Sequence, residues 1–158
     1  MAKEKPWFEE IPLPALLRHA RTTYGSAMRR ALVKAGYDDM PKNGLYVIGG
    51  LAMGAGGVPL GQLVKELGVS KQGAGQLVDT LVLRGYLERT VDDEDRRKLT
   101  VKLTPRGRAA AAIQAEAREK IDAELISRVG AADMRRMRKM LVVLIRLGQG
   151  EAKESDEH

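Results

Sequence analysis

The side chains in this sequence that could do chemistry are mostly cations and amides, and few are nucleophiles or metal ligands. The 158 residues include no cysteine and two histidines, His19 and His158. Disulfides, thiolate metal sites and thiol nucleophiles are therefore excluded, and a Ser/His/Asp triad or a histidine-rich metal site is nearly excluded. We expect no enzyme, and neither a cofactor nor a metal site.

Positive charge is in modest excess over the whole chain. The 27 Lys and Arg residues outnumber the 21 Asp and Glu residues, which gives a net charge of +6 and a pI near 9.7. A surplus of this size is compatible with a polyanionic partner. The positions of the cations within the predicted elements are therefore informative about function.

A β-hairpin with a charged tip is expected over residues 86–103. Apolar and polar residues alternate in 99–103, and 86–90 is rich in strand-forming types, so the two runs are predicted to be strands. The loop between them has the sequence DDEDRRK.

Three cations, Arg96, Arg97 and Lys98, stand in the tip of this hairpin. Guanidinium groups at such a tip can enter a narrow minor groove of DNA, where negative potential is concentrated. Asp95 is placed to accept hydrogen bonds from Arg97 or from the loop backbone, which would orient the arginine. The alternative is a solvated, salt-bridged tip, because the acidic residues 92–94 precede the cations.

Two helices joined by a tight turn precede the hairpin. One helix is expected to open at Pro59 and the next at Ser70, a good N-cap, and the turn 68–70 completes a helix-turn-helix signature. At the start of the second helix, polar side chains lie off the apolar stripe, where a recognition helix contacts base edges. These residues are Ser70, Lys71, Gln72 and Gln76.

Gly73 and Gly75 interrupt the start of the same helix. Each glycine costs about 1 kcal/mol of helix stability relative to alanine. The missing side chains either let the backbone approach DNA closely or leave the helix with weak, unspecific base readout. The sequence leaves both interpretations open.

Another helix is expected to begin with Met40 as N-cap and Pro41 as its first residue. Lys42 and Asn43 would then lie at a helix N-terminus, which offers backbone donors to a phosphate. A plain surface position explains both residues equally well.

Long helices are expected near both ends of the chain, over 13–36 and 105–147, because apolar residues recur every three or four positions. Their stripes favour pairing with a second copy, and a polar, disordered tail is expected from 148 to 158. The uncharged stretch 43–64 is long enough to span a membrane, but its glycines and Pro59 argue against a span. Since no signal peptide is recognisable, we expect a cytoplasmic protein without a membrane partner.

The hairpin and the helix before it resemble the MarR (multiple antibiotic resistance regulator) family. The wing pattern of that family is D-x-R, five residues, then L-T and a nearby glycine, and it is matched by Asp95, Arg97, Leu103, Thr104 and Gly107. Residues 67–89 resemble the family's recognition helix and the strand that follows it. The likeness, including the order of helices, extends from about residue 13 to residue 147.

This resemblance implies a mainly α fold: a winged helix-turn-helix with a two-stranded wing and N- and C-terminal dimerisation helices. It divides the chain into an N-terminal arm (1–12), a winged helix-turn-helix domain (13–147) and the polar tail (148–158). Within the domain, the resemblance assigns dimerisation to 13–36 and 105–147 and DNA binding to 41–104.

By the same resemblance, the protein is expected to be a homodimeric, sequence-specific transcription regulator, a repressor that binds a pseudo-palindromic DNA operator. Members of the family often release the operator when a small ligand binds, so a small-molecule effector is a further candidate partner. The scarce aromatic residues are candidates to line its site, although each is more often a packing residue; they are Trp7, Phe8, Tyr24, Tyr37 and Tyr46.

Two alternatives from other classes remain. One is an architectural or weakly specific DNA-binding protein without a ligand, which the glycines in the recognition helix make credible. The other is a small enzyme or nucleotide-binding module, which the absence of cysteine and the scarcity of histidine disfavour.

Overall fold

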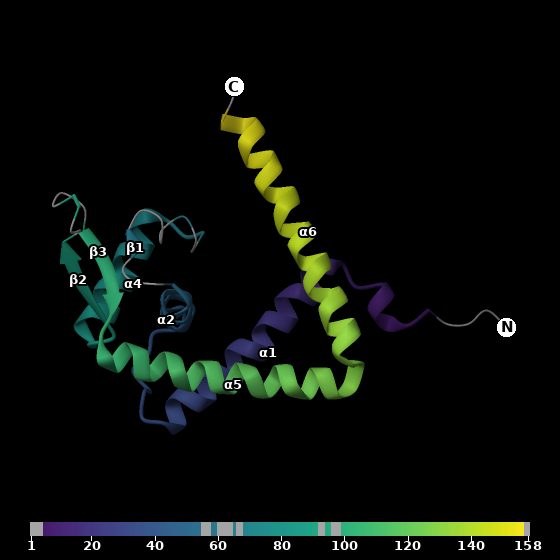
Figure 1. Ribbon diagram of the computed structural model, residues 1–158, viewed down its shortest axis with the longest axis horizontal. Helices are drawn as coiled ribbons and strands as arrows, with labels where there is room; N and C mark the ends of the chain where they lie inside the picture. The colour runs from purple at the N-terminus through teal and green to yellow at the C-terminus, as the bar shows by residue number, and fades with distance from the viewer. Residues whose placement is uncertain are drawn as a thin grey trace. The chain divides into compact units, whose positions relative to one another are not determined.

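The computed structural model describes residues 5–54, 58–59, 65, 68–91, 94–95 and 99–156 (Figure 1). The chain divides into two compact units, Met1–Arg118 and Glu119–His158. Each unit is considered separately below.

The first unit contains most of the elements that the sequence predicts for a winged helix-turn-helix, together with η1 and β1, which it does not predict. In chain order they are the 3-10 helix η1 (Trp7–Glu9), α1 (Leu13–Lys34), α2 (Gly44–Met53), β1 (Val58–Pro59), α4 (Lys71–Leu83), β2 (Leu87–Val91), β3 (Leu99–Leu103) and the first part of α5 (Pro105–Val129). The hairpin of β2 and β3 packs against α4 and α2 (Figure 1). This order agrees with the mainly helical fold expected from the sequence.

The hairpin belongs to a three-stranded antiparallel sheet with the order β1-β3-β2. In the hairpin Leu87 pairs with Leu103 and Val91 with Leu99, whereas Val58 of β1 pairs with Val101 on the other side of β3. The sequence analysis missed β1, because it predicted that Pro59 opens a helix. Proline lacks an N–H group and is tolerated in an edge strand, which is where Pro59 lies. Of the helix predicted after Pro59, the structure describes Lys65, which is helical; the other residues of 60–67 lie outside the described part.

One apolar core joins the elements of the first unit. Tyr86, at the start of the hairpin, is fully buried, and so are side chains three or four positions apart on α2 and α4. This spacing places them on one face of each helix. The largest buried apolar side chains are Leu32, Leu45, Val47, Ile48, Val78, Leu81, Tyr86, Leu87 and Val101.

Local capping signals define several helix ends as the sequence predicts. The hydroxyl of Ser70 accepts a hydrogen bond from the Gly73 N–H at 3.0 Å and caps α4. The hydroxyl of Thr104 accepts one from the Gly107 N–H at 3.0 Å and caps α5 in the same way. Gly85 and Gly130, with φ of 78° and 84°, follow α4 and α5 in the left-handed conformation that glycine adopts without strain.

The predicted start of α2 is wrong. Asn43, and not Met40, is the N-cap, and α2 begins at Gly44. Contacts from α1 explain the difference, because Arg29 donates hydrogen bonds to the carbonyl oxygens of Met40 at 3.3 Å and Lys42 at 2.6 Å. Met40 itself is drawn into the core and is 4% exposed. These tertiary contacts hold 40–43 in a turn that a local pattern does not reveal.

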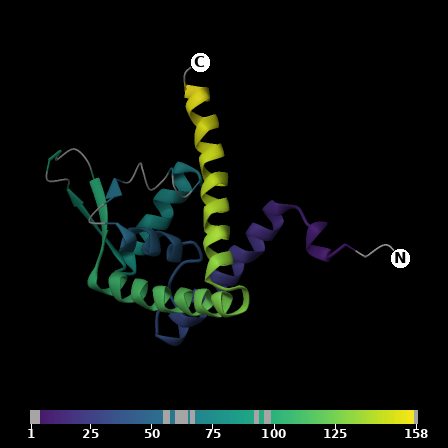
Figure 2. The same ribbon diagram turned by 45° about the vertical axis from the view of Figure 1, so that its right-hand side comes forward.

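The second unit consists of the end of α5 and the helix α6 (Ala131–Asp156). Arg138 of α6 lies 3.8 Å from Asp122 of α5 in an ion pair. The expectation of a disordered tail from Gly148 is wrong for the backbone, since α6 continues without a break to Asp156 (Figure 2). The residues after Gly150 are Glu, Ala and Lys, which have high helix propensity and offset the two glycines.

Close packing between α5 and the hairpin predicts the effect of a single methyl group. A Cβ at Gly107 would overlap the carbonyl oxygen of Tyr86, whereas a Cβ at Gly50 in α2 would meet no atom within 4 Å. Gly107→Ala is therefore expected to destabilise the protein by about 1–3 kcal/mol. The matched control Gly50→Ala should stabilise it by about 0.5–1 kcal/mol. Urea unfolding of both variants checks this, and equal stabilities would contradict the packing of α5 against Tyr86.

Candidate nucleic-acid interface

The predicted recognition helix presents its polar residues to solvent. Lys71, Gln72 and Gln76 are exposed on α4, while Ala74, Val78 and Leu81 on the other side are buried. Ser70 caps the helix, so its hydroxyl orients the first turn instead of pointing freely outward. The structure thus brings the predicted residues of α4 together on one exposed surface.

The two glycines of α4 differ in their surroundings. A Cβ at Gly73 would lie 3.1 Å from the hydroxyl oxygen of Ser70, a tight contact with the capping residue. A Cβ at Gly75 would meet nothing within 4 Å. Packing within the chain therefore accounts for a small residue at Gly73 and gives no reason for one at Gly75.

The base of the wing is attached to α4 by polar contacts. Arg89 of β2 forms an ion pair with Asp79 of α4. On the hairpin itself, Lys102 lies 3.3 Å from Glu88 in an ion pair. The first of these ion pairs connects α4 to the hairpin, and the second joins the two strands of the hairpin.

The wing tip is described in part. Asp95 is exposed, whereas Arg96, Arg97 and Lys98 lie outside the described residues. The orientation of Arg97 by Asp95 therefore stays a prediction.

Lys42 and Asn43 are both exposed beside the start of α2. Asn43 is the N-cap, and its side chain makes no capping hydrogen bond. Lys42 lies before the helix, in the turn that Arg29 holds. The structure places both residues at a helix N-terminus, although Lys42 is outside the first turn expected for it.

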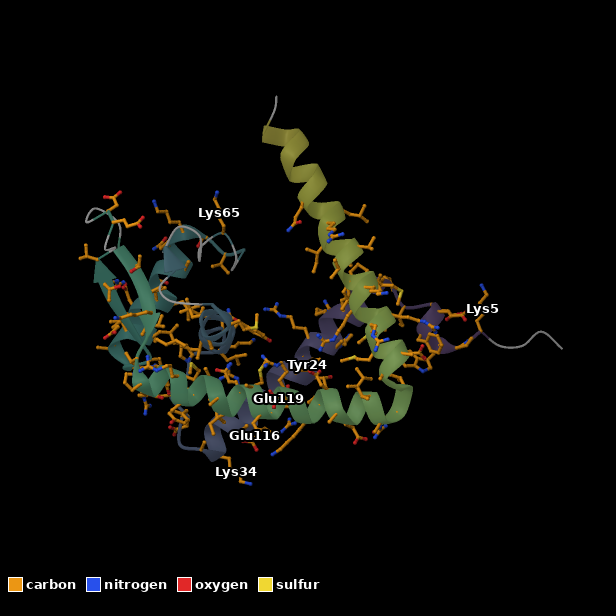
Figure 3. The ribbon with its side chains drawn as sticks, in the orientation of Figure 1. Lys5, Tyr24, Lys34, Lys65, Glu116 and Glu119 are labelled. Carbon is orange, nitrogen blue, oxygen red and sulfur yellow. The ribbon has the colours of Figure 1, made fainter. Side chains whose placement is uncertain are left out.

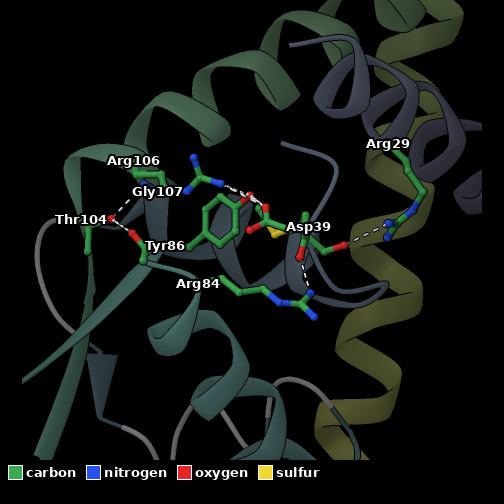
Figure 4. A network of polar contacts seen from close by, with 9 residues as sticks. Arg29, Asp39, Arg84, Tyr86, Thr104, Arg106 and Gly107 are labelled. Atoms are coloured by element: carbon green, nitrogen blue, oxygen red, sulfur yellow. Dashed lines mark hydrogen bonds and ion pairs between the residues drawn. The ribbon is translucent and has the colours of Figure 1, made fainter. Parts of the chain in front are cut away.

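A polar network that the sequence analysis missed joins four elements behind this surface (Figure 4). The hydroxyl of Tyr86 donates a hydrogen bond to the carboxylate of Asp39, and Arg106 of α5 reaches that carboxylate and the Tyr86 hydroxyl, each at 3.1 Å. Arg84, directly after α4, donates to the backbone carbonyl of Asp39. No local sequence motif predicts this network, because Asp39 and Arg106 are 67 positions apart.

The network changes the acidity of two of its members. Burial raises the pKa of Tyr86 to about 12, and the hydrogen bond to Asp39 adds to the shift. The hydrogen bond from Tyr86 lowers the pKa of Asp39; burial opposes this shift, and the positive charge of Arg106 adds to it. The charged Asp39 and the neutral Tyr86 are therefore the forms that the fold stabilises.

A cavity of about 280 Å³ lies between α1, α2 and α5 within the first unit. Its lining includes Met28, Tyr46 and Gln114. Gln114 is 3% exposed and donates from Nε2 to the Leu45 carbonyl oxygen at 2.7 Å, while its Oε1 has no hydrogen-bond partner among the residues that the structure describes. A buried acceptor without a partner is costly and is suited to a donor that enters the cavity.

The other aromatic residues named from the sequence have different surroundings. Trp7 and Phe8 are 71% and 51% exposed, and their rings contact each other edge to face with centroids 6.1 Å apart. Tyr24 and Tyr37 pack against the core as partly buried residues. Tyr46 is thus the aromatic residue that lines this cavity.

Over the residues that the structure describes, no helix combines the length and the apolar character needed to cross a membrane. The uncharged stretch 43–64 contributes the ten-residue helix α2 and the short strand β1.

The exposed α4, the wing attached to it and the order of the elements define a winged helix-turn-helix protein. Residues 39–98 match the model of the MarR family. No curated protein matches the chain. Solved structures of similar fold include Streptococcus pneumoniae FabT in complex with DNA, with a TM-score of 0.72 and 20% identity over 87% of this chain and 96% of that chain.

Two further structures have the same architecture. The Staphylococcus aureus MepR–DNA complex has a TM-score of 0.69 and 17% identity over 87% of this chain and 98% of that chain. Reduced MarR from Escherichia coli has a TM-score of 0.66 and 22% identity over 85% and 96%. At these identities the likeness shows the fold, and the predicted winged helix-turn-helix fold is confirmed. The match to the MarR family model covers the segment 39–98, and this segment is therefore similar to that family.

The stability of the polar network is expected to depend on pH. Since the folded pKa of Asp39 lies below its ordinary value of 3.8, its ionised form stabilises the fold above that value and this contribution is lost as the pH falls through the folded pKa. Asp39→Asn should lower stability at pH 7 by about 1 kcal/mol, a modest amount because the partly exposed pair is screened by solvent. The difference from the original protein should shrink below pH 3.8.

Urea unfolding at several pH values measures this effect. The neighbouring Asp38→Asn is the matched control, since Asp38 is exposed and its carboxylate is outside the network. A stability loss in Asp39→Asn that is equally large at neutral and strongly acidic pH would contradict the assignment.

Proposed function

We propose that this protein is a sequence-specific transcription regulator that acts as a homodimeric, ligand-responsive repressor. The observation that carries the proposal is the capped helix α4, whose exposed side presents Lys71, Gln72 and Gln76 and whose Asp79 is paired with the wing. FabT and MepR, which share the fold, were solved in complex with DNA. This parallel supports DNA as the partner.

In this proposal, α4 enters the major groove. Gln72 and Gln76 have side-chain amides that pair bidentately with adenine, and Lys71 suits guanine or a phosphate. The wing residues Arg96, Arg97 and Lys98 contact the adjacent minor groove, with Asp95 orienting Arg97. Lys42 and Asn43 are proposed to position the phosphate backbone at the N-terminus of α2.

A homodimer is supported by the apolar surface of α6. Several of its large side chains are exposed, which is unusual for a monomer when such residues are contiguous on one helix. Two copies would present two α4 helices to half-sites about 34 Å apart on a pseudo-palindromic operator. The exposed residues include Met140, Val143, Ile145 and Leu147, at 64%, 58%, 59% and 62%.

Ligand response is supported by the cavity that contains Gln114. The cavity is lined by α1, α2 and α5, and α5 is also the helix that packs against the wing base through Gly107. A ligand that binds this cavity more tightly in one arrangement of the helices than in another would change the spacing of the two α4 helices. Repression would end when that spacing no longer fits the operator.

The alternative is an architectural or weakly specific DNA-binding protein. The observation that favours it is Gly75, which leaves the middle of the exposed side of α4 without a side chain. A protein of this kind would bind all duplexes with similar affinity at fixed salt.

Base readout by α4 predicts different effects for two neighbouring residues. Gln72→Ala should cost about 1–3 kcal/mol and relax the preference at one base pair of each half-site, because a bidentate contact is lost. If the partner of Lys71 is a phosphate, Lys71→Ala should weaken binding to all DNA sequences alike. It should also lower the slope of log affinity against log salt concentration by about 1. Selection from a randomised operator library at fixed salt distinguishes the two patterns.

Lys34→Ala is the matched control for a change in net charge. Lys34 lies at the end of α1 and points away from the rest of its unit (Figure 3). Its replacement should leave the base preference unchanged. An equal loss of affinity in Lys71→Ala and Lys34→Ala would indicate a general charge effect. An unchanged base preference in Gln72→Ala would contradict base readout by α4.

Gly75→Ala separates specific readout from the alternative. Alanine should stabilise α4 by about 0.5–1 kcal/mol, because nothing lies near its Cβ. If the backbone of α4 approaches the bases closely, the same methyl group should lower operator affinity by about 1–3 kcal/mol, the scale of one lost base contact. Unchanged or improved affinity together with higher stability would favour the weakly specific alternative.

The ligand cavity predicts selective stabilisation by a small aromatic donor. Phenol offers an apolar ring and an O–H group that can donate to Oε1 of Gln114, whereas toluene has no such donor. A ligand at a concentration of about 100 times its Kd adds about 2.7 kcal/mol to the free energy of unfolding. Because the hydrogen bond to Gln114 should make phenol the tighter ligand, phenol should raise the midpoint of thermal unfolding more than toluene does. Ala115→Phe, which fills the cavity lining, should remove the effect, and equal shifts with both compounds would contradict a donor-specific site.

A further inference from the structure

A second cavity of about 280 Å³ lies between α1 and the start of α2 and is lined by four cations. Arg18, Arg21 and Arg29 come from α1, and Lys42 comes from the turn before α2. The remaining polar lining consists of hydroxyl and amide groups, from Thr22, Ser26, Asn43 and Tyr46. Every polar side chain of this lining can therefore donate a hydrogen bond, and none is an acid.

The positive charge of this cavity is not neutralised within the described part of the chain. Helix α1 contains no aspartate or glutamate over its 22 residues. Among the ion pairs of the described residues, none involves Arg18, Arg21, Arg29 or Lys42. Clustered cations without anionic partners repel one another, and an anion between them removes that repulsion.

Two of the guanidinium groups are held in place by neutral partners. Arg29 donates to the carbonyl oxygens of Met40 and Lys42, which fixes the side chain without cancelling its charge. Arg21 lies over the ring of Tyr46, 4.1 Å from its centroid. Tyr46 in turn reaches close to α1 at Gly25, where a Cβ would come within 2.7 Å of its hydroxyl oxygen.

We propose that this cavity binds the phosphoryl group of a small phosphorylated molecule. A phosphoryl group carries close to two negative charges and three acceptor oxygens, which matches several guanidinium and hydroxyl donors better than a single carboxylate does. Arginine side chains that are already held in place lose less entropy when the ligand binds. The donors line a hollow between two helices that includes no residue of α4 or of the hairpin. Lys42 and Asn43 are shared with the phosphate contacts of the proposed function, so the duplex affinity of the variants separates a small molecule from a DNA phosphate.

Binding by the free protein tests this site independently of DNA recognition. Isothermal titration with inorganic pyrophosphate, at constant ionic strength maintained with chloride, should show saturable binding. Arg21→Gln and Arg18→Gln should each weaken it at least about tenfold, since each removes one charged donor. Arg30→Gln is the matched control, because Arg30 is an exposed arginine of α1 that is not part of the lining, and it should change the Kd less than about twofold.

Three results would overturn the assignment. One is the absence of saturable pyrophosphate binding, and another is an equal loss in Arg30→Gln, which would indicate a general charge effect. The third is a loss of duplex affinity, without added pyrophosphate, in Arg18→Gln and Arg21→Gln but not in Arg30→Gln, because the cavity would then serve a DNA phosphate. Circular dichroism of the variants at the titration temperature verifies folding. Arg18 and Arg21 are used in place of Arg29, whose side chain also holds the turn before α2.

Discussion

The hydrogen bond between the hydroxyl of Tyr86 and the carboxylate of Asp39 is the contact on which the first unit depends. Tyr86 is fully buried, so its hydroxyl needs a partner inside the protein. Asp39 supplies that partner from the connection between α1 and α2, and Arg106 completes the arrangement from α5. The guanidinium of Arg106 also lies over the rings of Tyr37 and Tyr86, 5.1 and 4.6 Å from their centroids. Three segments distant in sequence are thereby fixed around one polar centre.

This centre connects the end of α4 and the base of the hairpin to α5 and to the connection between α1 and α2. Tyr86 lies directly between the end of α4 and the start of β2, and its carbonyl oxygen accepts a hydrogen bond from the Thr104 N–H at 3.1 Å where β3 leads into α5. Gly107 lets α5 pack closely on the same carbonyl. The Arg89–Asp79 ion pair adds a second connection between α4 and the hairpin. Helix α4 is thus held both near its C-terminal end, through Tyr86, and at Asp79. A helix held in this way loses less entropy when it binds a partner.

The two cavities described above share a wall formed by Leu45 and Tyr46 of α2. One is mostly apolar, with the unpaired oxygen of Gln114 and the cation Arg118 among its polar groups. The other is lined by four cations, so the two suit different chemical groups. Both are bounded by α1, whose lack of acidic residues concentrates positive charge on one side of α2. Helix α2 is therefore in a position to respond to ligands on either side, and its glycines at 44 and 49 keep it close to Pro41, Leu81 and Gln114.

The sequence by itself determined the hairpin and several helix ends, because these depend on residues a few positions apart. Ser70 and Thr104 cap α4 and α5 through the N–H three residues ahead, glycines end the helices, and alternation predicts β3 and its pairing with β2. The start of α2, the edge strand β1, the Asp39–Tyr86–Arg106 network, the unpaired oxygen of Gln114 and the cationic cavity were decided by the tertiary structure alone. In each of these, groups far apart in the chain meet, and their burial and partners follow from packing that no local pattern encodes.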